Sequence, residues 1–536
     1  MVTCGEVLVR LLEAYGVDTV FGIPGVHTVE LYRGLPASRI RHVTPRHEQG
    51  AGFMADGYAR VSGRPGVCFI ITGPGMTNVL TAMGQAYAES VPMLVVSSVN
   101  RTEHLGMGQG RLHELPSQRS VVAGVAAFSH TLLAPEQLPE VLARAFALFA
   151  SARPRPVHIE IPIDVITSEA GHLPLEPRPL PGRPGPAPDA IARAAELLRA
   201  AQAPLVVLGG GAVDAGEEAR RLVERLGAPV VNTVNAKGLL PPGHPLHAGE
   251  NMAWPPVREA LRAADVVAAV GTEFGETEMY PEPQPLTFDG SLIRIDLDPE
   301  QLVRTCPAAV PILSDARLAL AALDAALGGS GRTEVRDNGA TRAAEVRAAT
   351  RKHWWPAVAV HERVLDVVRR ALFEPIVVGD QTQPVYGGNQ FFEPSRPRSW
   401  FNSSTGYGTL GYALPAAIGA KLAAPERPVV ALIGDGGLQF TLPELAAAVE
   451  ARVPIVVLLW NNEGYGEIKT YMAEKDIPQI GVEIFTPDFV AIAEGFGCAA
   501  ERAGSLEHLQ KSLEAATGRT VPTLIEIRED APWLAA

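Results

Sequence analysis

The chain has 536 residues, 47% of them hydrophobic and 20% charged, so it can form about three domains with sizeable apolar cores. Its formal net charge of −13 argues against a nucleic-acid-binding surface, which is normally basic. No apolar run approaches the roughly 18 residues of a membrane span. The four cysteines are far apart and lack metal-ligand spacing, so we expect a cytoplasmic protein with reduced thiols that contacts neither nucleic acid nor membrane.

Two stretches of unusual composition predict linkers. Residues 171–190 hold seven prolines, too many for a helix or a central strand, and residues 328–341 are small, charged and glycine-rich. They divide the chain into predicted domains over 1–170, 190–328 and 342–536. Each domain alternates apolar runs with helical segments, which favours the α/β class with doubly wound parallel sheets.

The N-terminal segment contains a glutamate in an unusual position. Residues 1–16 predict an amphipathic helix rather than a signal peptide, because charged residues lie between the apolar ones. Further on, a short strand ends at Val43, and Glu48 falls in the first turn of the next helix, where a glutamate is normally solvated. The residues that follow, 50–55, are small and apolar, so this helix start should be packed. Packing would raise the pKa of the Glu48 carboxyl and suit it to proton transfer near neutrality.

A glycine turn and an irregular stretch follow. Residues 73–75, Gly-Pro-Gly, separate a strand from a helix, and fold geometry is their simplest interpretation. Residues 106–121 are glycine-rich and irregular. His113 and Gln118 are candidate catalytic residues there, although a lone histidine is more often structural.

The middle segment gives weak evidence for a nucleotide site. The glycines at 209–211 end a strand but lack the fuller dinucleotide fingerprint. Apolar runs over 264–274 and 292–302 add strands of a Rossmann-like sheet. Structural support is the simpler interpretation, and a bound FAD or other nucleotide stays open.

The last segment carries a strand-helix-strand pattern. An apolar run ends on residues 434–437, Gly-Asp-Gly-Gly, and a second one ends on Asn461 and Asn462. The carboxyl ends of neighbouring parallel strands share one sheet edge, where ligands bind. Either piece alone is more often a turn, but the pair is specific, with 24 residues between Gly436 and Asn461.

The residue types at this edge suit magnesium and a diphosphate. Asp435 supplies a carboxylate, Asn462 an amide oxygen and Gly464 a backbone carbonyl, which are the oxygen ligands that magnesium prefers. Gly434, Gly436 and Gly437 lack side chains, so backbone N–H groups can approach phosphate oxygens.

These motifs resemble those of thiamine-diphosphate-dependent enzymes of the acetolactate synthase, benzoylformate decarboxylase and pyruvate decarboxylase family. The matching residues are His47-Glu48 with residues 55–60 (Ala-Asp-Gly-Tyr-Ala-Arg), Gly73-Pro74-Gly75 with Thr77-Asn78, and the 434–462 motif. The resemblance covers most of the chain. It implies a thiamine-diphosphate-binding fold at both ends, the pyrimidine-binding domain first and the diphosphate-binding domain last, with a Rossmann-like domain between them. It also implies thiamine diphosphate and Mg²⁺ as cofactors.

The resemblance also implies residue roles. Glu48 would hydrogen-bond a pyrimidine nitrogen of thiamine, Leu410 would hold the cofactor in its bent form, and the Gly408 carbonyl would receive its amino group. In the family the glutamate and the diphosphate motif face each other across a subunit boundary, so at least a homodimer is implied and a homotetramer is common. The implied cofactor-binding set is Gly408, Leu410, Gly434, Asp435, Gly436, Gly437, Asn462, Gly464 and Tyr465.

The implied substrate is a 2-oxo acid that loses carbon dioxide. The remaining intermediate is then either protonated to an aldehyde or added to a second oxo acid. The chain departs from the family at three places. Val26 and His27 follow Gly25, where pyruvate decarboxylase-like relatives have an acid. The position at which those relatives have a later catalytic glutamate corresponds to about Ile468 here, with Glu467 adjacent. The position of the usual acetolactate synthase glutamine corresponds to about His113.

Residues 21–63 resemble most closely decarboxylases of 5-guanidino-2-oxopentanoate. A guanidinium tail needs a carboxylate partner, for which Glu467, Asp380 and Glu114 are candidates by position, and Gln383 lies at the same edge. Three alternatives stay open: an acetolactate synthase-type carboligase, an FAD-dependent 2-oxo acid oxidase, and a non-catalytic thiamine-binding protein.

Overall fold

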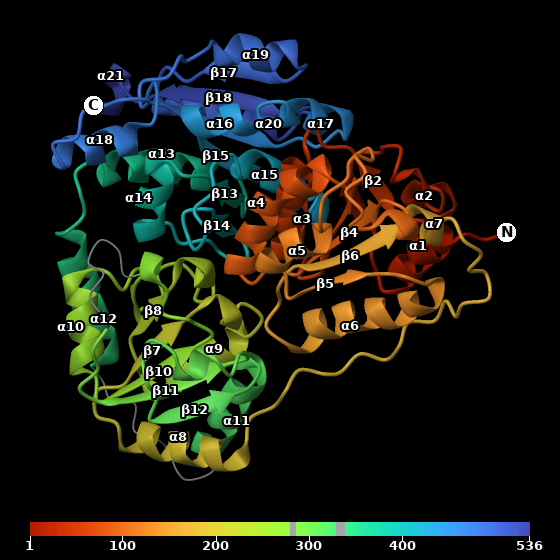
Figure 1. The fold of residues 1–536 in the computed structure, drawn as a ribbon. Helices are drawn as coiled ribbons and strands as arrows, with labels where there is room; N and C mark the ends of the chain where they lie inside the picture. The colour runs from red at the N-terminus through yellow and green to blue at the C-terminus, as the bar shows by residue number, and fades with distance from the viewer. Residues whose placement is uncertain (279–285, 329–337, 536) are drawn as a thin grey trace.

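The computed structural model describes residues 1–278, 286–328 and 338–535. Three six-stranded parallel sheets, each covered by helices, form three α/β domains (Figure 1). This confirms the predicted fold class. No helix within these ranges is both long and apolar enough to cross a bilayer. Most of the predicted linker 328–341 lies outside the described residues.

The N-terminal domain has the strand order β2-β1-β3-β4-β6-β5. Its first helix begins with a capping box, in which Thr3 and Glu6 satisfy each other's backbone N–H groups. The strands are β1 (Thr19–Gly22), β2 (Arg41–Val43), β3 (Gly66–Ile70), β4 (Met93–Val99), β5 (Phe128–Thr131) and β6 (Val157–Pro162). The helices are α1 (Cys4–Ala14), α2 (Val29–Tyr32), α3 (Glu48–Ser62), α4 (Pro74–Ala88), α5 (Gln118–Val122), α6 (Leu138–Ser151) and α7 (Ile163–Ile166).

The central domain has the strand order β12-β11-β10-β7-β8-β9. The strands are β7 (Leu205–Leu208), β8 (Val230–Asn232), β9 (His247–Gly249), β10 (Val266–Val270), β11 (Ser291–Asp296) and β12 (Val310–Leu313). The helices are α8 (Pro188–Ala200), α9 (Gly216–Leu226), α10 (Pro255–Ala263), α11 (Ala316–Gly328) and α12 (Gly339–Arg351). Helix α12 packs on α10 and β9, next to the predicted boundary at residue 342. The domain boundaries themselves stay a prediction.

The C-terminal domain has the strand order β14-β13-β15-β16-β18-β17. The strands are β13 (Ile376–Gly379), β14 (Trp400–Asn402), β15 (Val429–Gly434), β16 (Val456–Asn461), β17 (Ala499–Arg502) and β18 (Thr523–Arg528). The helices are α13 (Val358–Ala371), α14 (Gln383–Phe391), α15 (Ala413–Ala423), α16 (Asp435–Thr441), α17 (Glu444–Glu450), α18 (Gly466–Glu474), α19 (Phe489–Gly495), α20 (Leu506–Ala516) and α21 (Pro532–Ala535).

Helices α3 and α15 join the two terminal domains. A Cβ atom at Gly57 would lie 2.0 Å from the carbonyl oxygen of Ala416, and one at Gly419 would lie 1.8 Å from that of Met54. Only glycine allows this approach, because real Cβ atoms do not come so close to backbone. The two sheets therefore share one apolar core through these helices. In Figure 1 the N-terminal and C-terminal domains lie side by side above the central one.

Candidate active site

Three oxygen atoms converge at the end of β15. Asp435 begins α16 and is 1% exposed, and its carboxylate accepts the backbone N–H of Gly464 at 2.9 Å. The side-chain oxygen of Asn462 faces Asp435 Oδ1 at 3.1 Å and the carbonyl oxygen of Gly464 at 3.0 Å, and only a flipped amide would turn these contacts into hydrogen bonds. Octahedral oxygen ligands 2.0–2.1 Å from magnesium lie about 3.0 Å apart. The Asn462 oxygen therefore lies at ligand spacing from both Asp435 Oδ1 and the Gly464 carbonyl oxygen, as expected around one hard cation.

The donor set is also chemically selective. Within residues 1–278, 286–328 and 338–535, no group of three or more His, Cys, Asp or Glu side chains could hold a metal. The triad instead combines one carboxylate with two neutral oxygens. Magnesium usually takes one or two protein carboxylates and completes its shell with phosphate and water. Zinc, which prefers nitrogen and sulfur, would find no such ligand set here.

The glycines around Asp435 are required by close packing. A Cβ atom at Gly436 would lie 2.7 Å from the Tyr465 ring, and one at Gly437 would lie 2.9 Å from Asp380 Oδ1. At Gly434 a Cβ atom would lie 3.1 Å from the Thr382 hydroxyl. The three loops that follow β13, β15 and β16 are therefore packed into one surface. The predicted contact of these glycines with phosphate stays a prediction.

Asp380 holds the loops of this surface together by accepting backbone hydrogen bonds. It is fully buried and accepts backbone N–H groups from Gln381 at 2.8 Å, Ala413 at 3.0 Å and Gly411 at 3.3 Å. Burial raises its pKa to about 6, although the backbone N–H groups act in the opposite direction. Its carboxyl group is thus committed to holding the loop that carries Gly408, whose φ is 76°, and Leu410.

Glu467 has a different environment at the same edge. It lies exposed in the first turn of α18, and desolvation raises its pKa, whereas the nearby Glu474 charge adds to this effect and the Gln383 side chain acts in the opposite direction. Its neighbour Ile468 is 51% exposed. Glu114, in contrast, accepts backbone N–H groups from Arg111 at 2.9 Å and Gln109 at 3.3 Å within an exposed loop.

Glu48 begins α3 in the N-terminal domain, as the sequence predicted. Its Oε2 atom accepts a hydrogen bond from the Asn78 amide at 3.0 Å. A Cβ atom at Gly75 would lie 3.1 Å from Glu48 Oε1. The Gly-Pro-Gly turn therefore packs against the Glu48 carboxyl group in addition to connecting the strand to the helix.

Two histidines lie on the other side of that turn. The rings of His27 and His113 have centroids 5.2 Å apart, and both Nδ1 atoms are buried without a hydrogen-bond partner. A Cβ atom at Gly73 would lie 2.7 Å from the His113 carbonyl oxygen. Desolvation, then the nearby His113, lowers the pKa of His27. Val26, the preceding residue, is 71% exposed.

Gln118 is buried and fully engaged. Its amide oxygen accepts the Gly73 N–H at 3.0 Å and the Thr72 hydroxyl at 2.9 Å. Its amide nitrogen donates to the Ser97 hydroxyl at 3.0 Å and to Glu160 at 3.1 Å. The side chain therefore holds the turn between Glu48 and His113 and has no hydrogen-bonding capacity left for a ligand.

Glu444 is a residue that the sequence reasoning missed. It lies on α17, is 1% exposed, and accepts the backbone N–H groups of Arg46 at 3.0 Å and His47 at 3.1 Å. Burial raises its pKa to about 7. A Cβ atom at Gly50 would lie 2.2 Å from the Glu444 Oε1 atom. The glycine two residues after Glu48 was therefore the one sequence feature that pointed to a close contact here. A carboxylate of the C-terminal domain thus caps the helix that Glu48 begins.

The two groups of site residues remain separate within one chain. Among the described residues, no hydrogen bond or ion pair joins Glu48, His27 or His113 to Asp435 or Asn462. They are linked only indirectly, through α3, α15 and Glu444.

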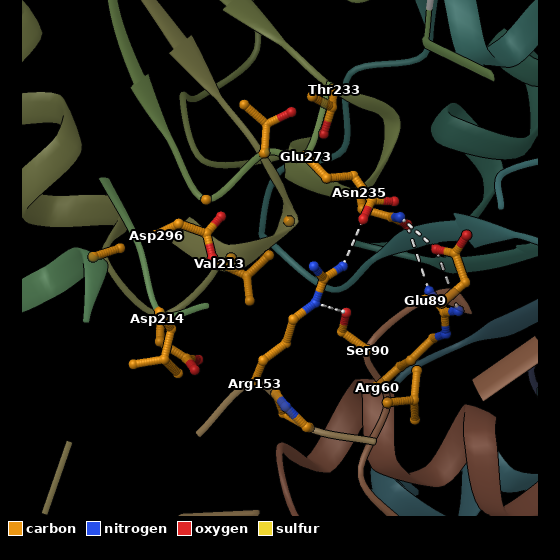
Figure 2. A pocket seen from close by; sticks show the side chains of 18 of the residues that line it. Arg60, Glu89, Ser90, Arg153, Val213, Asp214, Thr233, Asn235, Glu273 and Asp296 are labelled. Carbon is orange, nitrogen blue, oxygen red and sulfur yellow. Dashed lines mark hydrogen bonds and ion pairs between the residues drawn. The ribbon is translucent and has the colours of Figure 1, made fainter. Parts of the chain in front are cut away.

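A cavity of about 270 Å³ lies where the three domains meet (Figure 2). Arg153 crosses it and pairs with Glu273 at 2.7 Å, while Asn235 donates to Glu89 at 2.6 Å. Ligand pockets usually measure about 300–1,000 Å³. The cavity is smaller than this range, and each arginine that lines it is already paired with a carboxylate, as Arg153 is with Glu273 and Arg398 with Asp214. It therefore offers neither the room nor an unpaired cation for the two phosphates of FAD.

Comparisons with known proteins agree with this arrangement. Family models of thiamine pyrophosphate enzymes match residues 2–121 (N-terminal TPP binding domain), 191–323 (central domain) and 380–527 (C-terminal TPP binding domain). The chain is 52% identical over 531 residues to the probable 2-ketoarginine decarboxylase AruI of Pseudomonas aeruginosa, covering 98% of this chain and 94% of that protein.

Acetolactate synthases are also similar. Identity is 33% over 549 residues to the large subunit of Corynebacterium glutamicum (96% of this chain, 84% of that protein). It is 32% over 547 residues to the isozyme 1 large subunit of Escherichia coli (99% and 94%). The resemblance predicted from the motifs is confirmed: the chain belongs to the thiamine pyrophosphate enzymes.

Proposed function

We propose that this protein is a carboxy-lyase that uses thiamine diphosphate and Mg²⁺ to convert 5-guanidino-2-oxopentanoate, also called 2-ketoarginine, to its aldehyde and carbon dioxide. The observation that carries the proposal is the 52% identity to a probable 2-ketoarginine decarboxylase over nearly the whole chain. Acetolactate synthases at 33% and 32% identity keep carboligation as the second candidate. The small central cavity, whose arginines are already paired with carboxylates, disfavours the FAD-dependent oxidase.

The diphosphate would be held at the end of β15. Asp435, Asn462 and Gly464 would bind the Mg²⁺ that bridges the protein to the phosphates, in keeping with the 3.0–3.1 Å separations of their oxygens. Tyr465 closes the site over Gly436. Leu410 and Gly408, on the loop that Asp380 holds, would support the bent cofactor.

The N-terminal residues would handle protons. When bound, the thiazolium ring supplies the electron sink for the bond to the departing carboxylate. Glu48 would form a hydrogen bond with a pyrimidine nitrogen. His27 and His113 have unpartnered Nδ1 atoms and would deliver the proton that completes the aldehyde. Gln118 and Glu444 would act only as positioning residues: Gln118 fixes the Gly73 turn, and Glu444 fixes the start of α3.

A substrate panel tests the function. The full chain with Mg²⁺ and thiamine diphosphate is supplied with 5-guanidino-2-oxopentanoate, pyruvate and 2-oxooctanoate, and carbon dioxide, aldehyde and acetolactate are measured. We expect aldehyde and carbon dioxide in equal amounts from the guanidino acid and no acetolactate from pyruvate. Acetolactate as the main product would replace the proposal with the carboligase.

Substitution Glu48→Gln should lower turnover more than cofactor binding. A hydrogen bond to a charged group contributes about 1.5–3 kcal/mol, so its loss should cost about ten- to a hundredfold in kcat. The Kd for thiamine diphosphate, measured by calorimetry, should change by less than about threefold, because the metal site is untouched. Glu103→Gln, on the exposed side of the same domain, is the control. Wild-type kcat in Glu48→Gln would remove Glu48 from the mechanism.

Substitution of the carboxylate metal ligand should instead weaken cofactor binding. Asp435→Asn removes the one carboxylate of the triad, so Mg²⁺-dependent binding of thiamine diphosphate should weaken by at least about tenfold. Chelation of Mg²⁺ should weaken wild-type binding in the same way and add little in the variant. Asp476→Asn, at an exposed position after α18, is the control. Equal cofactor binding by Asp435→Asn and wild type would contradict the assignment.

We also infer a homodimer at minimum, in the cytoplasm, with a homotetramer as the larger form. Large apolar side chains stay exposed at the edges that carry the two groups of site residues, and all four cysteines are free. They include Val26 (71%), Leu112 (62%), Met107 (58%), Phe440 (54%), Tyr407 (53%) and Ile468 (51%). Light scattering should give twice or four times the 56.9 kDa chain mass, and an active monomer would refute the inference.

A further inference from the structure

We propose that a cavity between the central and C-terminal domains binds a small organic acid with a flat apolar body. The cavity has a volume of about 490 Å³, within the range of about 300–1,000 Å³ that is usual for ligand pockets. Strand β9 and helix α12 line it from the central domain, and α13 and the end of α14 line it from the C-terminal domain. None of the described residues that line it belongs to the two groups of site residues, so this site goes beyond the proposed function.

Four carboxylates of the described residues line the cavity, and each already has a partner. The ion pairs are Glu250 with Lys237 (3.1 Å between oxygen and nitrogen), Glu362 with Arg351, and Asp366 with Arg369 (2.8 Å). Glu393 hydrogen-bonds the His247 ring at 3.2 Å and accepts the backbone N–H of Gly243 at 2.7 Å. A cationic ligand would therefore have to displace a partner that is already in place.

Arg347 is the cation of this wall that lacks a carboxylate. It lies half-buried on α12, and its guanidinium donates to the backbone carbonyl of His247, which leaves further N–H groups of the fork unused. Among the described residues no ion pair to Arg347 occurs, whereas Arg351 and Arg369 in the same wall are paired. A partly desolvated guanidinium without a counterion favours an anionic ligand, and its planar fork matches a carboxylate.

Two further hydrogen-bonding groups of the wall have no partner. Thr350 is 5% exposed, and its hydroxyl makes no hydrogen bond. The indole N–H of Trp354, in the turn that continues α12, is also buried without an acceptor. Arg347, Thr350 and Trp354 follow one another at three- and four-residue spacing and so lie on one side of this segment. Buried polar groups are rarely left unpaired, and all three of these groups can donate, which favours a ligand rich in acceptor oxygens.

Aromatic rings form the apolar part of the wall. Trp254, just before α10, is held by its indole N–H, which donates to Gln390 at 2.7 Å. The Trp354 ring lies beside Phe391, with ring centroids 6.3 Å apart, and the Arg351 guanidinium lies 4.9 Å from the Trp354 centroid. Gln390 and Phe391 belong to α14, so the C-terminal domain keeps both indoles of the central-domain side in place. Rings fixed in this way suit a flat apolar body next to the carboxylate that Arg347 would bind.

Titration calorimetry on the full chain loaded with Mg²⁺ and thiamine diphosphate tests the site. The probe is benzoate, and benzyl alcohol is the neutral comparison of similar shape. We expect benzoate to bind at one site per chain and benzyl alcohol to bind at least about tenfold more weakly, because only a carboxylate makes a charge-assisted pair with the guanidinium. Equal binding of the two probes, or no binding of benzoate, would overturn the proposal.

Variants of the wall locate the bound probe. Arg347→Gln should weaken benzoate binding at least about tenfold, and Thr350→Val, which keeps the side-chain shape, about threefold. Lys352→Gln, at an exposed position just after α12, is the matched control and should leave the Kd unchanged. Benzoate should raise the Tm of wild type and of Lys352→Gln but not that of Arg347→Gln, because a ligand stabilises only the fold that binds it.

Unchanged benzoate binding in Arg347→Gln would place the probe elsewhere and overturn the site. If Arg347→Gln does not fold, Thr350→Val decides in the same way, since its unchanged Kd would overturn the site. The readout is binding alone, so the result does not depend on which 2-oxo acid the enzyme decarboxylates.

Discussion

The packing of α3 against α15 is the contact on which the rest of the molecule depends. Gly57 and Gly419 let the two helix backbones touch, and no larger residue fits at either place. Asp56 of α3 accepts the Tyr412 hydroxyl just before α15 at 2.5 Å, and it also pairs with Arg60 at 2.7 Å. A buried pair of this kind is favourable only when its groups are aligned, so it fixes how the two domains meet.

This contact fixes where the two groups of site residues lie within the chain. Glu48 stands at the N-terminus of α3, and the oxygen triad stands at the edge of the sheet that α15 covers. Glu444 reaches from the C-terminal domain to the N–H groups before Glu48, so the helix start is set by the opposite domain. A shift of one helix along the other would change the position of Glu48 relative to the oxygen triad.

The buried acids of the C-terminal edge differ in what they are used for. Asp380 and Glu444 satisfy backbone N–H groups and hold loops and helix ends in place. Asp435 combines both tasks, because it accepts the Gly464 N–H and still presents an oxygen to the triad. Glu467 is exposed, and no ion pair to it occurs among the described residues. The number of backbone N–H groups around each carboxylate thus distinguishes those that hold loops in place from those that can still bind a ligand.

The sequence by itself determined the class of fold, since apolar runs, glycines and polar strand ends are local patterns, and its motifs indicated the family, and with it the cofactor, by resemblance. It placed Glu48 in the first turn of a helix and grouped Asp435, Asn462 and Gly464 because parallel strands end at one edge. It could not rank Asp380, Glu114 and Glu467, because only the folded loops show which backbone N–H groups a carboxylate meets, whether 31 residues away, as Gly411 is from Asp380, or three, as Arg111 is from Glu114. It also missed Glu444, whose N–H donors are almost four hundred residues away. Only the tertiary structure decides which carboxylates are already satisfied, because hydrogen-bond saturation depends on which segments the fold brings together.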